Sequence, residues 1–410
     1  MTAAFEAKAS PNIIAWTDPA RASAFDGWLR SVAISHGLQA DSVRLASADA
    51  SFRRYFRVDA AAPDTDCANS SFIIMDAPPD KEDCKPFVKV AGLMQGAGLS
   101  APEVLAWDET AGFLLLSDLG AQTMMEALTK DIDPPPAVDA LTVMVQPTPA
   151  HYEHYLAAVD ALISWQLASK PGVLPPYDDA LLSRELALFP EWYVAKHRGF
   201  TLDATQQATL DGAFAQIKAS NLQSLEGARV YVHRDFMARN LIAPTLVASR
   251  TALPPGGALR LRPGEAGSAA PAGTNGDRLG VLDFQDAVYG PITYDIASLM
   301  RDAFLTWEED FVLDITVRYW QKARKAGLPV GDDFGEFYRA VEWMGLQRNL
   351  KILGIFARLT LRDGKPKYLA DTPRFIRYVR NTCARYRQLG PLMVLLDAIE
   401  GNETRVGYTF

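Results

Sequence analysis

The sequence predicts an α+β fold with two lobes, a small β-rich N-terminal lobe and a larger helical C-terminal lobe. The first observation is that three short β-prone segments lie within the first 118 residues, whereas long helical patterns predominate from Tyr152 onward. The second is length, because 410 residues exceed what one compact core normally holds. We therefore expect lobes of residues 1–118 and 119–410.

In the N-terminal lobe, Phe25, Leu29 and Val32 recur at helical spacing and predict an amphipathic entry helix over residues 18–37. A second helix is expected at 86–97, ended by Gly98. Three short β-prone segments surround it, at residues 55–58, 72–75 and 113–116. This order favours a small sheet with one packed helix.

In the C-terminal lobe, helical patterns cover residues 152–169, 181–198, 204–221, 295–326, 333–359 and 373–399. Five prolines in 130–149 predict an irregular loop between the lobes. Residues 243–280 are rich in Pro, Gly and Ala and contain no aromatic residue, which predicts a mobile surface insertion.

Charge and composition limit the function classes. A net charge of −8 argues against a nucleic-acid partner. No apolar run approaches the ~18 residues of a membrane span, and the first residues contain acids and a proline where a signal peptide has an apolar stretch. Three cysteines lack any metal-binding spacing. We expect a cytoplasmic protein with no membrane contact and no obligate protein partner.

The strongest chemical signal is the segment from His233 to Asn240, which has the form H-R-D-x-x-x-x-N, followed by Asp283 at the end of an apolar strand. In phosphoryl transfer an aspartate in this place, here Asp235, accepts the proton of the attacking hydroxyl or orients that hydroxyl. Asn240 and Asp283 offer the oxygen ligands that Mg²⁺ prefers. The pattern predicts a phosphotransferase. The alternative is that these residues only cap a turn and end a strand.

The chain resembles the aminoglycoside phosphotransferase and choline kinase superfamily. Four segments narrow the resemblance to the bacterial kinases that phosphorylate N-acetylmuramate and N-acetylglucosamine at the C1 hydroxyl in peptidoglycan recycling; they are residues 49–57, 75–79, 82–88 and 112–120. The resemblance covers nearly all of residues 20–400 apart from the two insertions. It implies a bilobal protein-kinase-like fold, ATP and Mg²⁺ as cofactors, and a small amino-sugar substrate.

Nucleotide binding is expected in the first hairpin, where residues 48–54 take the place of a glycine-rich loop. Ser51 offers a hydroxyl, and Arg53, Arg54 and Arg57 offer guanidinium groups that suit phosphate oxygens. Strand alternation puts Arg53 and Arg57 on one face and Arg54 on the other, so only one set can face the nucleotide. For each arginine, a structural role in the sheet is the alternative.

One position departs from the kinase pattern, because Met75 stands where the third strand should contain a phosphate-binding lysine. Either an arginine of the first hairpin replaces it, or nucleotide binding is weakened. Glu82 could orient such an arginine, or it is only an acid favoured by the dipole at the start of a helix. The resemblance places adenine against the backbone near Leu116 and Asp118.

The acceptor is expected in the helical lobe. Glu191 and Trp192 could form a platform for a sugar face, although aromatic residues at such positions are more often core. The resemblance assigns Asp295 to support of the catalytic loop. Further candidates for the acceptor, including cations that would suit the lactyl carboxylate of N-acetylmuramate, are Arg301, Asp302, Arg348 and Lys351.

Two other functions stay open at this point. The same chemistry could serve another small alcohol, such as an aminoglycoside or choline. A pseudokinase that binds ligand without turnover would account for the missing strand lysine, although Asp235, Asn240 and Asp283 argue against it.

Overall fold

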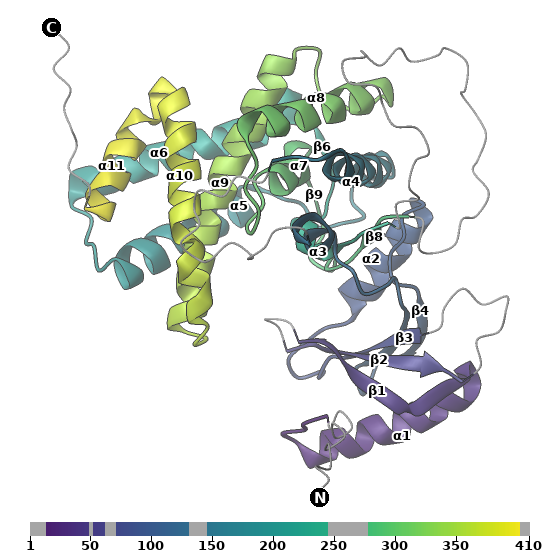
Figure 1. The fold of residues 1–410 in the computed structure, drawn as a ribbon. Helices are drawn as coiled ribbons and strands as arrows, with labels where there is room; N and C mark the ends of the chain where they lie inside the picture. The colour runs from purple at the N-terminus through teal and green to yellow at the C-terminus, as the bar shows by residue number, and fades with distance from the viewer. Residues whose placement is uncertain (1–13, 49–51, 62–70, 131–145, 245–277, 402–410) are drawn as a thin grey trace, which may run out of the picture. The chain divides into compact units, whose positions relative to one another are not determined.

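The computed structural model of the protein describes residues 14–48, 52–61, 71–130, 146–244 and 278–401 (Figure 1). Ser51, most of the predicted loop 130–149 and most of the predicted insertion 243–280 lie outside the described residues.

The chain forms two compact units, one of residues 1–121 and 244–285 and the other of residues 122–243 and 286–410. This differs from the predicted division at residue 118, because residues 278–285 belong to the first unit. The guanidinium of Arg278 donates to the carbonyl of Gly98, and the N–H of Val281 donates to the carbonyl of Ser100 at 2.8 Å.

The first unit contains an antiparallel sheet in the order β1-β2-β3-β5-β4 (Figure 1). The three predicted strands and both predicted helices are confirmed as β2, β3, β5, α1 and α2, whereas β1 and β4 had no predicted range. The elements are α1 (Pro19–His36), β1 (Leu38–Ala48), β2 (Arg54–Ala60), β3 (Ser71–Asp76), α2 (Lys85–Gly96), β4 (Val104–Asp108) and β5 (Phe113–Ser117), with the short β8 (Gly280–Val281) later in the chain.

Helix α1 covers one face of this sheet. The carboxylate of Asp18 caps its first turn, and Gly37 ends it with a φ of 61°. Phe25 on the helix packs against Phe56 of β2 and Phe113 of β5, with ring centroids 5.3 and 5.6 Å apart. The other buried members of this core are Leu29, Val32, Leu38, Val58, Ile74 and Leu115. Because side chains alternate along a strand, Tyr55 and Met75 lie on the face of the sheet opposite to α1.

The second unit is mainly helical, with one antiparallel pair formed by β6 (Arg229–Val232) and β9 (Val288–Pro291). Its α-helices are α3 (Met124–Thr129), α4 (Pro149–Leu167), α5 (Asp179–Leu188), α6 (Ala204–Gln223), α7 (Thr293–Met300), α8 (Glu309–Lys325), α9 (Phe334–Leu361), α10 (Thr372–Arg385) and α11 (Gly390–Glu400). Shorter elements are the π-helix η1 (Phe189–His197), the 3₁₀ helices η2 (Ser224–Gly227), η3 (Ala238–Asn240), η5 (Pro366–Asp371) and η6 (Arg387–Leu389), and the strand β7 (Leu241–Ile242).

Two predicted helices are wrong because each is interrupted. The run 295–326 is broken between α7 and α8, where the Asp302 carboxylate accepts the backbone N–H groups of Phe304 and Leu305 and so competes with the helix. The run 373–399 is broken between α10 and α11. There Pro391 stands at the start of the new helix, a position that its missing N–H allows.

Helix α9 is buried along most of its length and packs closely against the junction of α5 and η1. Gly354 makes this approach possible, because a Cβ at that position would lie 2.3 Å from the carbonyl oxygen of Leu188. Two residues after Leu188, Pro190 stands at the start of the π-helix η1. Proline lacks an N–H and cannot donate a helical hydrogen bond there.

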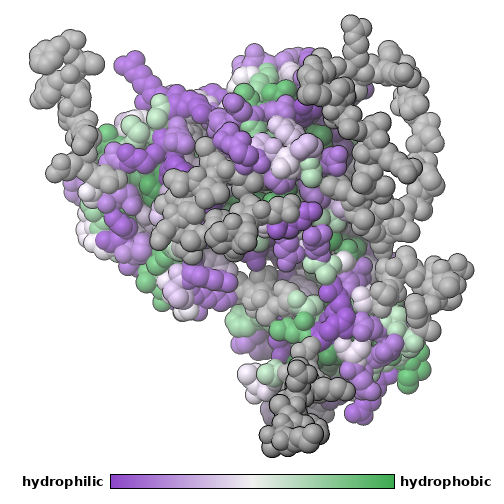
Figure 2. All heavy atoms as spheres, in the orientation of Figure 1, coloured by the Kyte–Doolittle hydropathy of each residue, from purple (hydrophilic) through white to green (hydrophobic). Residues whose placement is uncertain are grey.

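Hydrophilic residues predominate on the visible face of the protein, with hydrophobic residues in scattered groups between them (Figure 2). In the part of the chain that the structure describes, no helix is both long enough and apolar enough to cross a bilayer.

Candidate active site

The H-R-D segment directly follows β6, and a buried carboxylate holds its backbone. Oδ2 of Asp295 accepts the N–H of His233 at 2.7 Å, and Oδ1 accepts the N–H of Arg234 at 3.0 Å. Asp295 is fully buried, and burial raises the pKa of its carboxyl. The supporting role expected for Asp295 agrees with these contacts, which start the loop in a defined direction.

A second buried carboxylate holds the far end of the same loop. Oδ2 of Asp302 accepts the N–H of Ala238 at 3.0 Å, while Oδ1 accepts the N–H of Phe304 at 2.7 Å. Asp302 is 1% exposed, and burial raises the pKa of its carboxyl. The structure shows that Asp302 holds the loop that carries Asp235, while a substrate contact for Asp302 stays a prediction.

Asp235 and Asn240 lie between these two anchors, and both are partly exposed. The side-chain Nδ2 of Asn240 donates to the carbonyl oxygen of Asp235 at 2.9 Å, and the N–H of Asp235 lies 3.2 Å from Nδ1 of His233. The first bond joins the two predicted catalytic residues directly. It also fixes the orientation of the Asn240 amide, since the nitrogen points back into the loop and the oxygen lies on the other side of the amide.

Left-handed backbone marks two of the motif residues. Arg234 has a φ of 78° and Asp283 a φ of 63°. In the described ranges, only two other non-glycine residues have positive φ, Leu225 and Glu226 in the η2 turn. Such conformations cost ~1–3 kcal/mol and cluster at functional sites. The Asp283 carboxylate accepts a hydrogen bond from Nε2 of Gln285 at 2.8 Å.

Behind the loop, Glu185 is the centre of a buried network that the sequence analysis missed. Its Oε1 accepts from Arg234 at 2.6 Å and from Lys351 at 2.8 Å. Its Oε2 accepts from the hydroxyl of Tyr177 at 2.7 Å and from Nε2 of Gln347 at 2.9 Å. Tyr177 just before α5, Arg234 of the H-R-D segment and two residues of α9 therefore meet at one carboxylate, and Arg234 is the chain neighbour of Asp235.

The network keeps its charges at neutral pH. Burial raises the pKa of Glu185, but the charges of Lys351 and Arg234 outweigh it and hold that pKa well below the usual range. Burial lowers the pKa of the Lys351 ammonium, but Glu185 outweighs burial and the net change is upward. Arg234 is therefore paired with a charged Glu185 at neutral pH.

In the first unit, Arg53 and Glu82 form an ion pair. Nε and Nη2 of Arg53 donate to Oε2 of Glu82 at 3.1 and 3.0 Å, and both side chains are mostly buried. Oε1 of Glu82 also accepts the N–H of Phe52 at 3.2 Å. Met75 is fully buried in the sheet. Of the two roles considered for Glu82, the structure favours orientation of an arginine.

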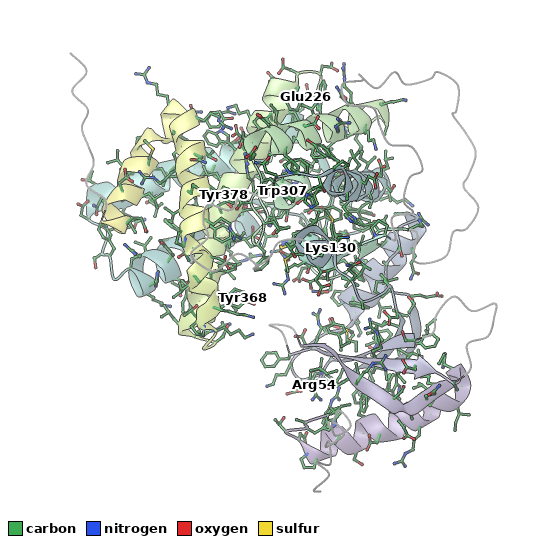
Figure 3. All side chains as sticks on the ribbon, viewed as in Figure 1. Arg54, Lys130, Glu226, Trp307, Tyr368 and Tyr378 are labelled. Atoms are coloured by element: carbon green, nitrogen blue, oxygen red, sulfur yellow. The ribbon has the colours of Figure 1, made fainter. Side chains whose placement is uncertain are left out.

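The other two predicted arginines also bind carboxylates of the first unit. Arg54, labelled in Figure 3, donates to Asp76 at 2.6 Å and stacks 3.9 Å from the ring centroid of Trp16, on the α1 side of the sheet. Arg57 donates to both oxygens of Asp118, at 2.5 and 3.0 Å. Burial raises the pKa of Asp118, but the hydrogen bonds from Arg57 and Ser71 outweigh it and lower that pKa.

The backbone position predicted to meet adenine lies where β5 ends. Leu116 pairs with Ile73 of β3 and Val104 of β4, and Asp118 follows the last strand residue. Oδ1 of Asp118 accepts the N–H of Gly120 at 3.0 Å. The Asp118 side chain thus organises the exit from the sheet.

The remaining acceptor candidates are spread over the second unit. Glu191 lies on η1 and pairs with Lys196 at 2.8 Å, and the Lys196 ammonium is 3.4 Å from the ring centroid of Trp192. Arg301 binds Glu309 at 3.0 Å, near Tyr378, which Figure 3 labels. Arg348 is buried, and its Nη1 donates to the carbonyl of Arg234 at 2.8 Å. The last contact makes Arg348 a further support of the catalytic loop.

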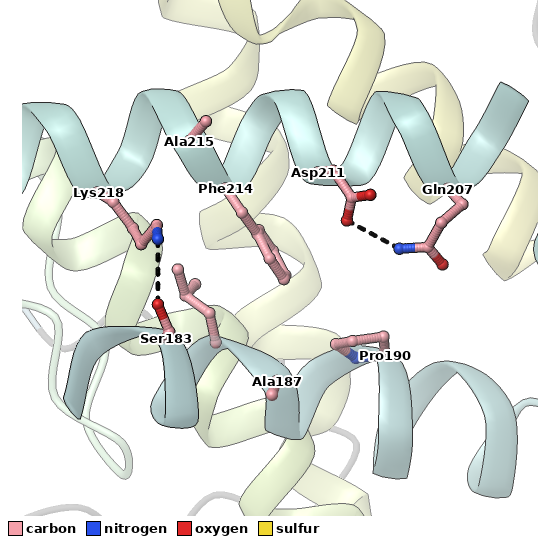
Figure 4. Close-up of a pocket in the computed structure, with 9 residues that line it drawn as sticks. Ser183, Ala187, Pro190, Gln207, Asp211, Phe214, Ala215 and Lys218 are labelled. Carbon is pink, nitrogen blue, oxygen red and sulfur yellow. Dashed lines mark hydrogen bonds between the residues drawn. The ribbon is translucent and has the colours of Figure 1, made fainter. Parts of the chain in front are cut away.

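A separate pocket of about 400 Å³ lies between α5 and α6 (Figure 4). Leu186, Pro190 and Phe214 supply apolar walls, and the polar lining groups bind one another, as Lys218 does Ser183 at 3.1 Å. None of its lining residues belongs to the predicted site. The hydrogen-bonded loop of Asp235 and Asn240, and not this pocket, is therefore the candidate active site.

The fold and this loop define a phosphotransferase. The profile of the phosphotransferase enzyme family matches residues 42–245 and 273–333, and the chain belongs to that family. The predicted superfamily and the predicted enzyme class are both confirmed.

Two relatives narrow the comparison. The chain is 44% identical over 370 residues to the N-acetylmuramate/N-acetylglucosamine kinase of Neisseria meningitidis serogroup B. The alignment covers 89% of this chain and 93% of that protein. It is 43% identical over 354 residues to the kinase of the same name from Pseudomonas aeruginosa, with 86% and 87% covered.

A solved structure supports the fold. The aminoglycoside phosphotransferase APH(2'')-Ib with ADP bound superposes with a TM-score of 0.51 at 13% identity, covering 86% of this chain and 97% of that one. The predicted bilobal protein-kinase-like fold is confirmed.

Proposed function

We propose that this protein is a sugar kinase that transfers the γ-phosphoryl group of ATP to the anomeric hydroxyl of N-acetylmuramate or N-acetylglucosamine, in peptidoglycan recycling. The observation that carries the proposal is the catalytic loop, in which Asp235 and Asn240 are hydrogen-bonded to each other between Asp295 and Asp302. The names of the relatives at 44% and 43% identity support the choice of sugar. A cytoplasmic location, where ATP is available, remains part of the proposal.

In the proposed reaction the anomeric oxygen forms a bond to the γ-phosphorus while the bond from that phosphorus to the bridging oxygen of ADP breaks. Asp235 orients the hydroxyl and accepts its proton. Asp295 and Asp302 act through the backbone, because they hold the two ends of the loop that carries Asp235. These are positioning residues, as is Arg348.

Asn240 and Asp283 would hold Mg²⁺. The donor set fits, since it consists of an amide oxygen and a carboxylate, the hard ligands that this ion takes. The orientation of the Asn240 amide fits as well, because its nitrogen is the end bonded to the loop. When bound, the ion offsets the negative charge of the nucleotide phosphates.

For the nucleotide, we propose that Arg53 takes the place of the missing strand lysine and that Glu82 orients it. The support is their ion pair, which has the same charges as the lysine–glutamate pair of protein kinases. Ser51, Arg57, Leu116 and Asp118 remain proposed nucleotide residues, Arg57 and Asp118 as a pair. This assignment weakens the pseudokinase alternative, whose motive was the missing lysine.

The assignment predicts different outcomes for neighbouring arginines. Arg53→Ala should raise the KM for ATP or lower kcat/KM by about ten- to hundredfold, because a charge-assisted phosphate contact is worth ~1.5–3 kcal/mol. Arg54→Ala is the matched control: its guanidinium packs on Trp16 and binds Asp76, so the melting temperature should fall and the KM for ATP should hold. Steady-state kinetics and thermal unfolding of both variants decide the matter. Equal KM values for wild type and Arg53→Ala would reject the role of Arg53.

The proposed function is tested by measuring ATP-dependent phosphorylation of a panel containing both sugars, an aminoglycoside and choline. We expect turnover with the two N-acetylated sugars, a sugar 1-phosphate as the product in ³¹P spectra, and loss of turnover when EDTA removes Mg²⁺. Turnover restricted to the aminoglycoside or choline would transfer the function to that alcohol. Nucleotide binding without turnover on any acceptor would restore the pseudokinase alternative.

A further inference from the structure

We propose that Arg239 recognises the carboxylate of an acidic acceptor and sets the preference of the enzyme between the two sugars. This inference rests on the proposed function and adds to it a specificity-determining residue. Arg239 belongs to the catalytic loop itself, between Asp235 and Asn240, and its side chain is partly exposed.

The guanidinium of Arg239 lies on an aromatic ring. Its central carbon is 4.8 Å from the ring centroid of Phe304, a cation–π contact that orients the group without neutralising it. Across the described ranges, no carboxylate forms an ion pair with Arg239. The loop that carries Asp235 therefore also carries an oriented positive charge without a carboxylate partner in the described ranges.

The ring beneath Arg239 is itself fixed. Asp302, which accepts the N–H of Ala238, also accepts the N–H of Phe304 at 2.7 Å, so one buried carboxylate ties the ring to the loop. Phe356 of α9 packs on Phe304 with centroids 6.4 Å apart. Nη1 of Arg374 donates to the adjacent carbonyl of Ala303 at 2.8 Å. Arg239 is thus held on a rigid support.

Four other cations of the second unit already have anionic or carbonyl partners. Arg234 and Lys351 bind Glu185, Arg301 binds Glu309, and Arg348 donates to a loop carbonyl. Arg301, Arg348 and Lys351 were the cations that the sequence suggested for the lactyl carboxylate. Because those cations already have partners, we assign that role to Arg239.

The chemistry of the two sugars makes this role specific. N-acetylmuramate is N-acetylglucosamine with a lactyl ether on O3, so the sugars differ by one carboxylate on the same ring that carries the reacting C1 hydroxyl. A guanidinium on the loop of Asp235 can bind that carboxylate while the aspartate meets the hydroxyl. Planar guanidinium–carboxylate pairs are strong because two parallel N–H groups donate to two oxygens.

The test is the ratio of kcat/KM for N-acetylmuramate to kcat/KM for N-acetylglucosamine, measured on one preparation so that any loss of folded enzyme cancels. Arg239→Gln should shift this ratio toward N-acetylglucosamine by about ten- to hundredfold, since a hydrogen-bonded charge contact is lost. Arg239→Lys, which keeps the charge without the planar fork, should shift it less. Arg339→Gln is the matched control, because Arg339 stacks on Trp343 at the same 4.8 Å but lies on α9, away from the loop; its ratio should equal that of wild type.

The outcomes separate this inference from the proposed function. If wild type phosphorylates both sugars and Arg239→Gln leaves the ratio within twofold, Arg239 does not read the carboxylate and the inference is overturned. An equal loss of kcat/KM on both sugars would also overturn the inference, and it would point to the phosphoryl group as the ligand of Arg239. If wild type phosphorylates neither sugar, the proposed function fails and the inference fails with it.

Discussion

Asp235→Asn should lower kcat by about 10²- to 10⁴-fold, the usual contribution of a positioned base. The fold should be unaffected, because the hydrogen bonds that tie residue 235 to His233 and Asn240 are made by its main chain. The amide also has nearly the same size as the carboxylate. Turnover and the KM for ATP of the purified variant provide the measurement.

The control for this substitution is thermal unfolding with and without ATP. Wild type and Asp235→Asn should have similar melting temperatures, and ATP should raise both. A variant that turns over within tenfold of wild type would remove Asp235 from the chemistry. A variant that has lost the ATP-induced shift would show a defect in binding instead.

Glu185→Gln should destabilise the protein by about 3–5 kcal/mol, because it leaves two buried cations, Arg234 and Lys351, without their counter-charge. The amide nitrogen would also face the donor of Gln347. Chemical denaturation measures the loss. The matched control is Glu191→Gln, whose ion pair with Lys196 is about half exposed on both sides and should contribute ~0–1 kcal/mol.

The destabilisation by Glu185→Gln should depend on pH. Folding holds the pKa of Glu185 below its ordinary value of 4.5, so the stabilising charge is fully present above that value and is lost as the pH falls through the folded pKa. The difference in unfolding free energy between wild type and variant should therefore be largest near neutral pH and shrink below pH 4.5. A difference that grows on acidification would mean that Glu185 is protonated in the folded protein.

The sequence alone indicated the chemistry because the H-R-D-x-x-x-x-N segment is local. Its residues need only one loop, so their spacing along the chain reports their relation in space. The Arg53–Glu82 pair could also be anticipated from local sequence, because strand alternation places Arg53 and Arg54 on opposite faces. The role of Glu185 could not be predicted, because Arg234 and two residues of α9 come from distant segments and nothing in its own helical pattern distinguishes Glu185 from a surface acid.

Helices were predictable where apolar periodicity and end signals agreed, as in α1 between Asp18 and Gly37. The break after α7 carried no such signal, because residues 301–308 contain neither Gly nor Pro and the interruption depends on the side chain of Asp302. The break before α11 could have been found from Gly390 and Pro391, although the apolar pattern continues through it.

Gly354 bears on how natural variation in this protein should be interpreted. Any side chain there would collide with the main-chain carbonyl of Leu188, and a carbonyl in a packed helix junction cannot rotate away as a flexible side chain can. A mutational scan scored by cell growth would therefore mark this glycine as intolerant, as it would Asp235. The two would differ in protein abundance, which substitutions at Gly354 should lower and Asp235→Asn should not. Invariance at Gly354 among related sequences would thus reflect helix packing, and only a readout of abundance alongside activity would distinguish it from chemistry.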